Sequence, residues 1–399
     1  MKTDAPASER SLVLVLAAVQ FTHIMDFMIM MPLGPQLMRV MLISPQQFAL
    51  LISAYTVTAA IAALAVAFHM DRFDRRKTLL FLYAGFVVAT LLCGIAPGYG
   101  ALLAARAVAG AFGGLAGATV HSIIGDAVPE QRRGAATGMI MSAFALSSIV
   151  GVPIGLVLAV HFSWRSPFLF LAVISTLVLL LTWKVLPPMR GHMVEGESHR
   201  PLHQMKAVFG SANHLRAFVF MFALMFAGFS VIPFIAPYMV ANVGLRETDL
   251  PYLYFFGGFA TAFSSRYIGK LADRHGKRQI FTLIGLISIA PLLITTNLPP
   301  VSVPVAICAS VIFMVFVSGR FVPAMALVIS SVQPRLRGGF MSINSAIQQF
   351  GMGAASLLAG SIIGHGVGST LTHYWLVGFI AVGATLLAIL LAWQVKPVA

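Results

Sequence analysis

Between two long apolar runs stands Gly269-Lys270-Leu271-Ala272-Asp273-Arg274-His275-Gly276-Lys277-Arg278, a short string rich in charge. A related string, Asp71-Arg72-Phe73-Asp74-Arg75-Arg76-Lys77, also lies between apolar runs, and its first aspartate precedes Asp273 by 202 residues. A second pair of similar strings, 128–134 and 332–338, repeats at nearly the same offset. Two repeats with one spacing, close to half the chain, predict a duplicated domain.

The composition predicts a membrane protein. Of 399 residues, 59% are hydrophobic and only 10% are charged, too few to cover a water-soluble domain of this size. About 20 helical residues cross a bilayer, and an unpaired strand is too costly in lipid, so each apolar run predicts a helix. The prediction is an all-α integral membrane fold of twelve transmembrane helices in two pseudo-symmetric six-helix bundles. The runs begin near Ser11, Gln46, Thr78, Tyr99, Arg132, Ser166, Arg216, Glu247, Lys277, Val301, Arg337 and His373.

Three segments follow from this pattern. We expect an N-terminal bundle over 1–187, a polar cytoplasmic linker over 188–215 and a C-terminal bundle over 216–399. The first run follows Lys2 and Arg10 but has no small-residue cleavage site, so we interpret it as an uncleaved first helix.

Basic residues predict the orientation. The chain has 26 Lys and Arg and a formal net charge of +14. Arg39, Arg165 and Arg246 lie in loops on one side, Arg106 and Arg320 lie inside spans, and the others lie in the termini and the loops of the opposite side. By the positive-inside rule both termini are cytoplasmic. The charge then faces anionic membrane lipid, and no nucleic-acid partner is expected.

One acidic residue of the twelve, Asp26, lies deep in a span. A carboxylate there costs several kcal/mol unless it is paired, protonated or facing water. Counting 1.5 Å per residue, Asp26 and Arg106 reach similar depths, roughly 20 Å from the cytoplasmic side. A changing distance between them would switch the proton affinity of the carboxylate, which is a device for proton coupling. The alternative is a permanent ion pair that joins two helices.

Two more polar residues of the spans are candidates for roles in transport. His23 lies one helical turn before Asp26, where it would share the proton or hold the carboxylate; a histidine that only bonds a neighbouring helix is the alternative. Arg320 is placed near the cytoplasmic end of the tenth span, where it would snorkel or form a gate. The proton is the expected coupling ion, and neither a cofactor nor a metal is expected.

The two turns and the twelve-helix pattern resemble the major facilitator superfamily over the whole chain. The family signature Gly-x-Leu-Ala-Asp-Arg-x-Gly-Arg-Lys matches the second turn closely, whereas Ala67 and Asp74 replace glycines in the first. The resemblance implies that these turns lock the cytoplasmic ends of the halves while the cavity faces outward, through Asp71, Arg72, Arg75, Gly269, Asp273, Arg274, Gly276 and Arg278.

Two spans carry further motifs of this family. Leu102-x-x-x-Arg106-x-x-Ala109-Gly110 resembles the motif of the fourth helix, whose arginine the resemblance implicates in proton coupling. Gly151-Val152-Pro153-Ile154-Gly155 resembles a degenerate antiporter motif. Gly151, Pro153 and Gly155 would also let the fifth helix bend, or would simply let helices pack closely.

The cargo is predicted from the side chains of the spans. Phe27, Met30, Phe222, Met225, Phe226 and Phe229 suit hydrophobic or amphipathic molecules if they face the cavity. Asn344 and Gln348, four residues apart, would instead bind sugar hydroxyls or bond neighbouring helices. A methionine pair at Met221 and Met225 resembles that of copper importers, but the expected His-x-x-x-Met partner is missing.

The sequence therefore predicts a proton-coupled secondary transporter of the drug:proton antiporter type in the bacterial inner (plasma) membrane. It would export hydrophobic or amphipathic small molecules as a functional monomer that contacts membrane lipid and its substrate. Efflux of sugars or metabolites and flipping of lysolipids are the alternatives. An enzyme is not expected, because the spans contain no nucleophile with its base and no zinc-binding His-Glu-x-x-His.

Overall fold

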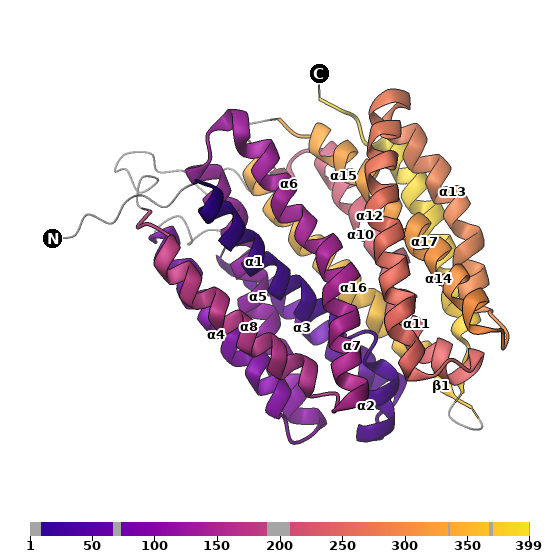
Figure 1. The fold of residues 1–399 in the computed structure, drawn as a ribbon. Helices are drawn as coiled ribbons and strands as arrows, with labels where there is room; N and C mark the ends of the chain where they lie inside the picture. The colour runs from indigo at the N-terminus through magenta and orange to yellow at the C-terminus, as the bar shows by residue number, and fades with distance from the viewer. Residues whose placement is uncertain (1–8, 67–72, 190–207, 334–335, 367–369, 399) are drawn as a thin grey trace.

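The computed structural model describes the chain except for residues 1–8, 67–72, 190–207, 334–335, 367–369 and 399 (Figure 1). The described N-terminal half contains α1 (Glu9–Ile29), α2 (Gly34–Met41), α3 (Pro45–Val66), α4 (Arg75–Ile95), α5 (Tyr99–Ala127), α6 (Glu130–Leu146), the π-helical turn η2 (Ser147–Gly151), α7 (Val152–His161) and α8 (Ser166–Val185).

The C-terminal half repeats this order of long helices. It contains α10 (Ala212–Phe229), η3 (Ile232–Phe234), α11 (Ile235–Tyr238), η4 (Met239–Val243), η5 (Glu247–Asp249), α12 (Leu250–His275), α13 (Lys277–Thr296), α14 (Val303–Gly319), α15 (Phe321–Ser330), α16 (Arg337–Ile362), β1 (Gly364–His365), β2 (Leu371–Thr372) and α17 (Tyr374–Gln394).

Twelve membrane-spanning segments result, as predicted. Ten described segments are long and apolar enough to cross a bilayer, and three of them join consecutive elements: α6 to α7, α10 to η4, and α14 to α15. The 26-residue helices α12 and α16 are more polar and occupy the eighth and eleventh positions. The short α2 and the antiparallel hairpin β1–β2 were not predicted, and both lie in connections between spans. Most of the predicted 188–215 linker falls outside the described residues.

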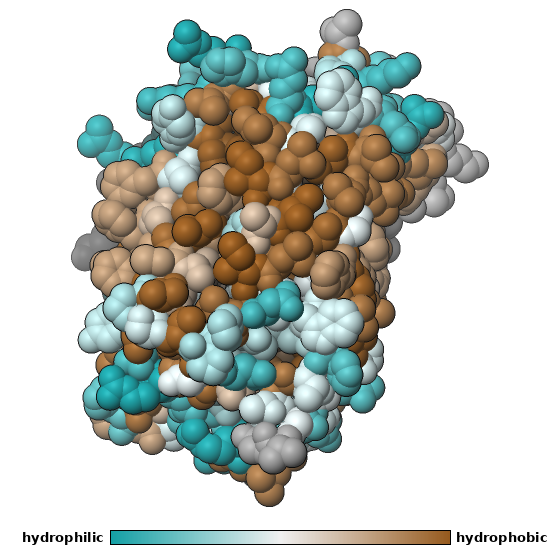
Figure 2. Space-filling model, turned by 90° about the vertical axis from the view of Figure 1, so that its right-hand side faces the viewer, coloured by the Kyte–Doolittle hydropathy of each residue, from teal (hydrophilic) through white to brown (hydrophobic). Residues whose placement is uncertain are grey.

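A hydrophobic belt surrounds the molecule. In Figure 2, hydrophobic side chains cover the middle of the visible face, and hydrophilic side chains gather above and below it. Large apolar side chains on this surface are exposed, among them Phe81, Phe263 and Leu390. Such exposure is unfavourable in water but matches the acyl chains of a bilayer, so these side chains face lipid.

The two ends of the bundle differ in charge. Helix α1 begins and α17 ends at the same end of the molecule (Figure 1). This end, here called the basic end, also holds Arg76, Arg132 and Lys277 at helix starts. The opposite end, here called the far end, holds α2, the hairpin and the turn before α12.

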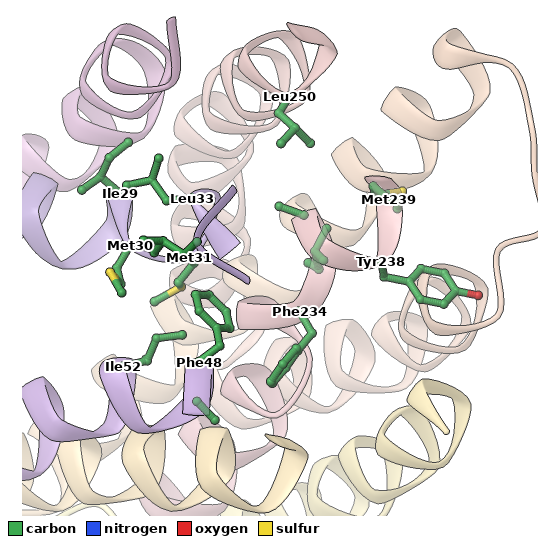
Figure 3. Close-up of a cluster of buried hydrophobic side chains, with 14 of the residues drawn as sticks. Ile29, Met30, Met31, Leu33, Phe48, Ile52, Phe234, Tyr238, Met239 and Leu250 are labelled. Atoms are coloured by element: carbon green, nitrogen blue, oxygen red, sulfur yellow. The ribbon is translucent and has the colours of Figure 1, made fainter. Parts of the chain in front are cut away.

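A single apolar cluster joins the halves toward the far end (Figure 3). The far-end cluster includes Ile29, Met30, Met31, Leu33, Phe48 and Ile52 from the N-terminal half and Phe234, Tyr238, Met239 and Leu250 from the C-terminal half. The rings of Phe48 and Phe234 meet edge to face with centroids 5.8 Å apart, a contact worth about 0.5–1.5 kcal/mol. In lipid, where apolar helices gain no hydrophobic drive, close packing of this kind holds the halves together.

Toward the basic end the halves have separate cores. One cluster, around Leu16, Tyr83 and Ile123, draws its described members from the N-terminal half. The other, around Phe220 and Phe340, draws its buried members from the C-terminal half, and only Leu64 of α3 packs against it from the other side. Hydrogen bonds between the halves include those of Arg39 with Glu247 and of the Ser356 hydroxyl with the Ala49 carbonyl, 3.5 Å, and both lie on the far side. The described structure is thus closed at the far end.

Candidate functional site

The centre of the N-terminal half contains a buried ion pair. Arg106 of α5 donates through Nη1 to the Asp26 carboxylate at 2.7 Å and to the Asp26 carbonyl at 3.3 Å. Neither side chain has any exposed surface. The hydroxyl of Thr90 donates to the other carboxylate oxygen at 3.4 Å. The depth count from the sequence predicted that these two charges lie at one level, and the structure brings them into contact.

Tyr55 of α3 completes the surroundings of the guanidinium. The central carbon of Arg106 lies 4.4 Å from the centroid of the Tyr55 ring, a cation–π contact. In a desolvated place such a contact contributes about 2 kcal/mol. The arginine therefore keeps a partner on its ring side even when the carboxylate is protonated.

Glycines of α5 create the room for this site. A β-carbon at Gly110 would overlap the Tyr55 carbonyl, and one at Gly113 would stand 2.8 Å from the Tyr55 hydroxyl. At Gly113 it would also stand 2.7 Å from a ring carbon of His23. Small residues let helix backbones approach closely, so α1, α3 and α5 meet around the ion pair.

Several buried polar atoms near the pair have no partner among described residues. They are Gln20 Oε1, both ring nitrogens of His23, the Tyr55 hydroxyl, and Nε and Nη2 of Arg106. Buried polar atoms rarely remain unpaired, and such groups usually bind water or a ligand. His23 contacts the rings of Tyr55 and Phe86 rather than the Asp26 carboxylate, so it stands beside the ion pair without bonding to it.

Aromatic rings connect the site to the C-terminal half. Phe27 of α1 lies 5.5 Å from Tyr55 and 5.9 Å from Phe229 of α10, measured between ring centroids. Phe222 and Phe226 stack on each other at 6.0 Å and are half-buried. Of these four predicted cavity residues, Phe27 and Phe229 meet across the boundary between halves, and Phe222 and Phe226 lie on the same helix as Phe229.

Other predicted cavity residues lie elsewhere. Met30 is fully buried in the far-end cluster, so in this structure it belongs to the closure and not to an open cavity. Met225 packs against Gly351 of α16 within the C-terminal half. Asn344 is fully buried with both amide atoms unpartnered among described residues, whereas Gln348 is half-buried.

The fifth span is irregular where the sequence suggested a bend. The π-helical turn η2 ends at Gly151, and Pro153 stands in the first turn of α7. Gly151 packs on the Met25 sulfur and Gly155 on Ile29, both from α1. On the other side, Gly258 of α12 approaches Ser148 of η2, where a β-carbon would stand 2.7 Å from the hydroxyl oxygen. This segment therefore contacts α1 and α12 at once.

The two basic turns repeat one set of contacts. Arg76 donates to the Trp183 carbonyl at the end of α8, and Arg278, 202 residues later, donates to the Ala392 and Val395 carbonyls at the end of α17 while lying over Trp393. Cations at helix C-termini satisfy carbonyls that the helix leaves unpaired. Each turn thus fastens the third helix of its half to the sixth.

The remaining turn residues differ between the copies. Arg75 forms an ion pair with Asp126 at 3.0 Å. Gly276 has φ of +94°, a conformation that favours glycine, and Gly269 packs on Val322 of α15. Asp273 and Arg274 are exposed. Asp71 and Arg72 lie outside the described residues.

Arg320 lies inside the C-terminal half and not between the halves, so this structure does not place it as a gate. It is 1% exposed, interrupts the helix between α14 and α15, and donates to the hydroxyls of Thr385 at 2.7 Å and Ser288 at 3.3 Å. The span breaks at this residue, and its side chain bonds α13 and α17 instead of reaching the membrane surface.

Several contributors to the site carry no signal in the sequence. Tyr55 and Thr90 lie in apolar runs without a motif, and only their buried contacts with Arg106 and Asp26 reveal them. The cross-half pair of Arg39 with Glu247 was also missed, although both lie in loops of the same side.

Two similar six-helix halves that meet at one end over a buried ion pair are the architecture of secondary transporters with alternating access. The family model described as Major Facilitator Superfamily matches residues 16–313 and 217–399 of this chain. The chain belongs to the Major Facilitator Superfamily and is a membrane transporter, not an enzyme.

Known relatives agree with this assignment. An uncharacterized MFS-type transporter, YbcL of Bacillus subtilis (strain 168), is 25% identical over 87% of this chain and 86% of its own length. A probable sugar efflux transporter of Helicobacter pylori (strain G27) is 22% identical over 58% of each chain. The crystal structure of a D-xylose-proton symporter shares the fold, with a TM-score of 0.77 and 16% identity over 97% of this chain and 98% of that one.

Proposed function

We propose that this protein exports hydrophobic or amphipathic small molecules in exchange for protons. The observation that carries the proposal is the contact of Asp26 with Arg106, because a buried carboxylate whose partner is another side chain can exchange that partner for a proton. The pair lies on the side of the far-end cluster that leads to the basic end. We further propose that the basic end is cytoplasmic, that the membrane is the bacterial inner (plasma) membrane, and that the monomer is the working unit.

The cycle follows from the two closures of the molecule. With the far end closed, substrate enters from the cytoplasm and a proton leaves Asp26, which then pairs with Arg106. When the basic end closes and the far-end cluster opens, the carboxylate meets the outer solution, takes up a proton and releases Arg106. One carboxylate of this kind gives one proton per cycle, so exchange for a neutral solute moves charge and exchange for a monovalent cation does not.

Aromatic side chains support a hydrophobic substrate. Phe27 and Phe229 meet where the halves meet, next to the stacked pair of Phe222 and Phe226. These four aromatic rings, one from the N-terminal half and three from the C-terminal half, suit flat or hydrophobic molecules, which bind by van der Waals and stacking contacts rather than by hydrogen bonds. Replacement of Phe27 or Phe229 by alanine is expected to raise the KM for lipophilic cations several-fold, while Phe81→Ala, on the lipid-facing surface, leaves it unchanged.

Sugar or metabolite efflux is the second candidate. The buried, unpartnered amide of Asn344 and the resemblance to a probable sugar efflux transporter favour it. Amides bind hydroxyl groups through paired hydrogen bonds, so Asn344→Leu would abolish sugar transport but leave export of lipophilic cations intact.

The deciding experiment uses proteoliposomes with an internal pH dye and an imposed proton gradient. Lipophilic cations, neutral amphiphiles and sugars are added in turn to wild type, to Asp26→Asn and to Glu9→Gln, a control that neutralises a carboxylate at the basic end, where it pairs with Arg132. We expect substrate-driven proton movement in wild type and in the control, and substrate binding without proton movement in Asp26→Asn. Unchanged uphill transport by Asp26→Asn would overturn the coupling role.

A further inference from the structure

A column of polar side chains runs along the glycine face of α5. At one end, Tyr55 lies against Arg106. Next comes His23, whose ring and the Tyr55 hydroxyl flank Gly113. A turn further along, a β-carbon at Gly117 would stand 3.5 Å from Gln20 Oε1 and 3.8 Å from His23 Nδ1. The column therefore follows α5 from the ion pair toward the basic end.

His121 stands at the outer limit of this column. Its Nδ1 lies 2.9 Å from the Gly117 carbonyl, and its side chain is exposed. It precedes the end of α5 at Ala127 by six residues, about 9 Å, whereas Arg106 lies about 22 Å deeper. His121 lies four residues after Gly117, on the face of α5 that approaches His23. His121 is thus the member of the column nearest the basic end.

The hydrogen bond of His121 fixes which nitrogen is free. A carbonyl only accepts, so Nδ1 must carry the hydrogen and donate it to Gly117. Nε2 keeps its lone pair and can take a proton from water. In neutral His23 one ring nitrogen likewise donates and the other accepts, which is the requirement for passing a proton on.

Several neighbouring helices place side chains around His23. Helix α3 contributes Tyr55, against which Arg106 of α5 lies. Helix α5 also contributes His121 one turn beyond Gly117, and α1 itself contributes Asp26 one turn away. Helix α4 contributes the uncharged ring of Phe86. The buried atoms of this column without described partners, on Gln20, His23 and Tyr55, are placed to bind bridging water.

We propose that His121 and His23, with the polar atoms of Gln20 and Tyr55, form the proton route between the basic end and Asp26. For protonation, hydronium gives a proton to His121 Nε2 and becomes water; the imidazolium keeps its Nδ1–H on the Gly117 carbonyl and gives the Nε2 proton to bridging water on the side of His23. His23 accepts a proton on one nitrogen and releases one from the other, and the Asp26 carboxylate receives it and loses its bond to Arg106. Proton release from Asp26 runs through the same atoms in reverse. This route rests on the proposed function, the coupling of transport to Asp26, and specifies how the proton travels between Asp26 and the basic end.

The test compares three histidines that make the same local bond. His161 and His275 also place Nδ1 against the carbonyl four residues earlier, at 2.9 and 3.3 Å, and both are exposed, at the far end and the basic end respectively. Each of the three is replaced by alanine in proteoliposomes, and the rate of substrate-driven proton movement is followed from pH 6 to 8. His23→Asn and Asp26→Asn are measured beside them.

We expect His121→Ala to slow proton movement by at least about tenfold, with substrate affinity unchanged. Millimolar imidazole added on the basic side should restore its rate, because a small base can replace a proton relay but not a structural contact. His161→Ala and His275→Ala should match wild type. His23→Asn should be slow and should not respond to imidazole, since its ring nitrogens are buried.

Two results overturn the route, and they differ from failure of the coupling itself. If His121→Ala moves protons at the wild-type rate at every pH while Asp26→Asn is inactive, the proposed coupling stands but the route is rejected. A slow His121→Ala that imidazole does not restore would assign His121 a structural role and also reject it. Proton movement that persists in Asp26→Asn would reject the proposed coupling, and the route with it.

Discussion

Gly360 of α16 lies so close to α3 that a β-carbon on it would overlap Ala49 and stand 2.9 Å from the Pro45 carbonyl oxygen. This contact joins the halves at the far end, next to the hydrogen bond of Ser356 with the Ala49 carbonyl. Backbone cannot yield as a flexible side chain does, so any larger residue must push the two helices apart.

Gly360→Ala is therefore expected to open the far end. The distance between spin labels at Leu42→Cys and Tyr252→Cys, exposed positions in different halves, should shift toward longer values in a background with Cys308→Ser. Gly383→Ala is the matched control, since nothing lies within 4 Å of its added β-carbon. Equal distance distributions in both variants would contradict the role of this contact.

The ion pair of Arg39 with Glu247 also stabilises the conformation closed at the far end, but more weakly. Arg39 is 63% exposed, and exposed pairs contribute about 0.2–1 kcal/mol, which is at most roughly a fivefold change in a conformational ratio. Glu247→Arg should lower the population closed at the far end, and the exchanged pair Arg39→Glu with Glu247→Arg should restore it. The same label distances report the result, and high salt should weaken the effect. A double variant no better than the single one would disprove the pairing.

The turn before α12 makes a prediction about pH. Arg246 donates from its side chain and its backbone to Asp249, and the side-chain bond lowers the pKa of this carboxyl below its ordinary value. A lowered pKa in the folded protein means that the charged form stabilises the fold above the unfolded pKa of about 3.9, and that this gain disappears as pH falls through the folded pKa.

Asp249→Asn should consequently be less stable than wild type at pH 7, by about 0.2–1 kcal/mol as for other ion pairs with an exposed partner. On acidification below about pH 4 it should lose less stability than wild type does. Thermal unfolding in detergent over pH 3 to 7 measures the difference between the two proteins. A constant difference across this range would show that the carboxyl does not titrate with folding.

Arg320 is predicted to serve the stability of the C-terminal half. Its bonds to Ser288 and Thr385 join α13 and α17 to the break between α14 and α15. Arg320→Lys keeps the charge but loses the forked geometry, and should lower the unfolding temperature in detergent by several degrees. Proton coupling per transported molecule should stay at the wild-type value, because Asp26 lies in the other half. A change in that ratio at normal stability would assign Arg320 to the transport cycle.

The sequence predicted the fold well because bilayer thickness fixes helix length. The predicted span starts lie close to the observed ones, for example Tyr99 and Ser166 as the first residues of α5 and α8. It also predicted the level of Asp26 and Arg106, since depth along a helix needs only a residue count.

Direction around the helix axis was harder to predict. A helix that is apolar on all sides gives no periodic signal of which face turns inward. Met30 was therefore expected in the cavity, although it belongs to the far-end cluster. Arg320 was expected near the cytoplasmic end of its span, because no residue of this apolar run predicts that the helix breaks there. The roles of Tyr55 and Thr90 could be recognised only from the structure, in which α1, α3 and α4 surround Arg106.

The location of the buried charges has a consequence for synthesis of the protein. Asp26, Thr90 and Arg106 belong to the first four spans, so the carboxylate can find its counter-charge as soon as α5 enters the membrane, before the second half has been translated. The partners of Arg320 likewise come from its own half. Each half can thus leave the ribosome with its buried arginine already paired or bonded, and joining the halves requires mainly the fitting of apolar surfaces.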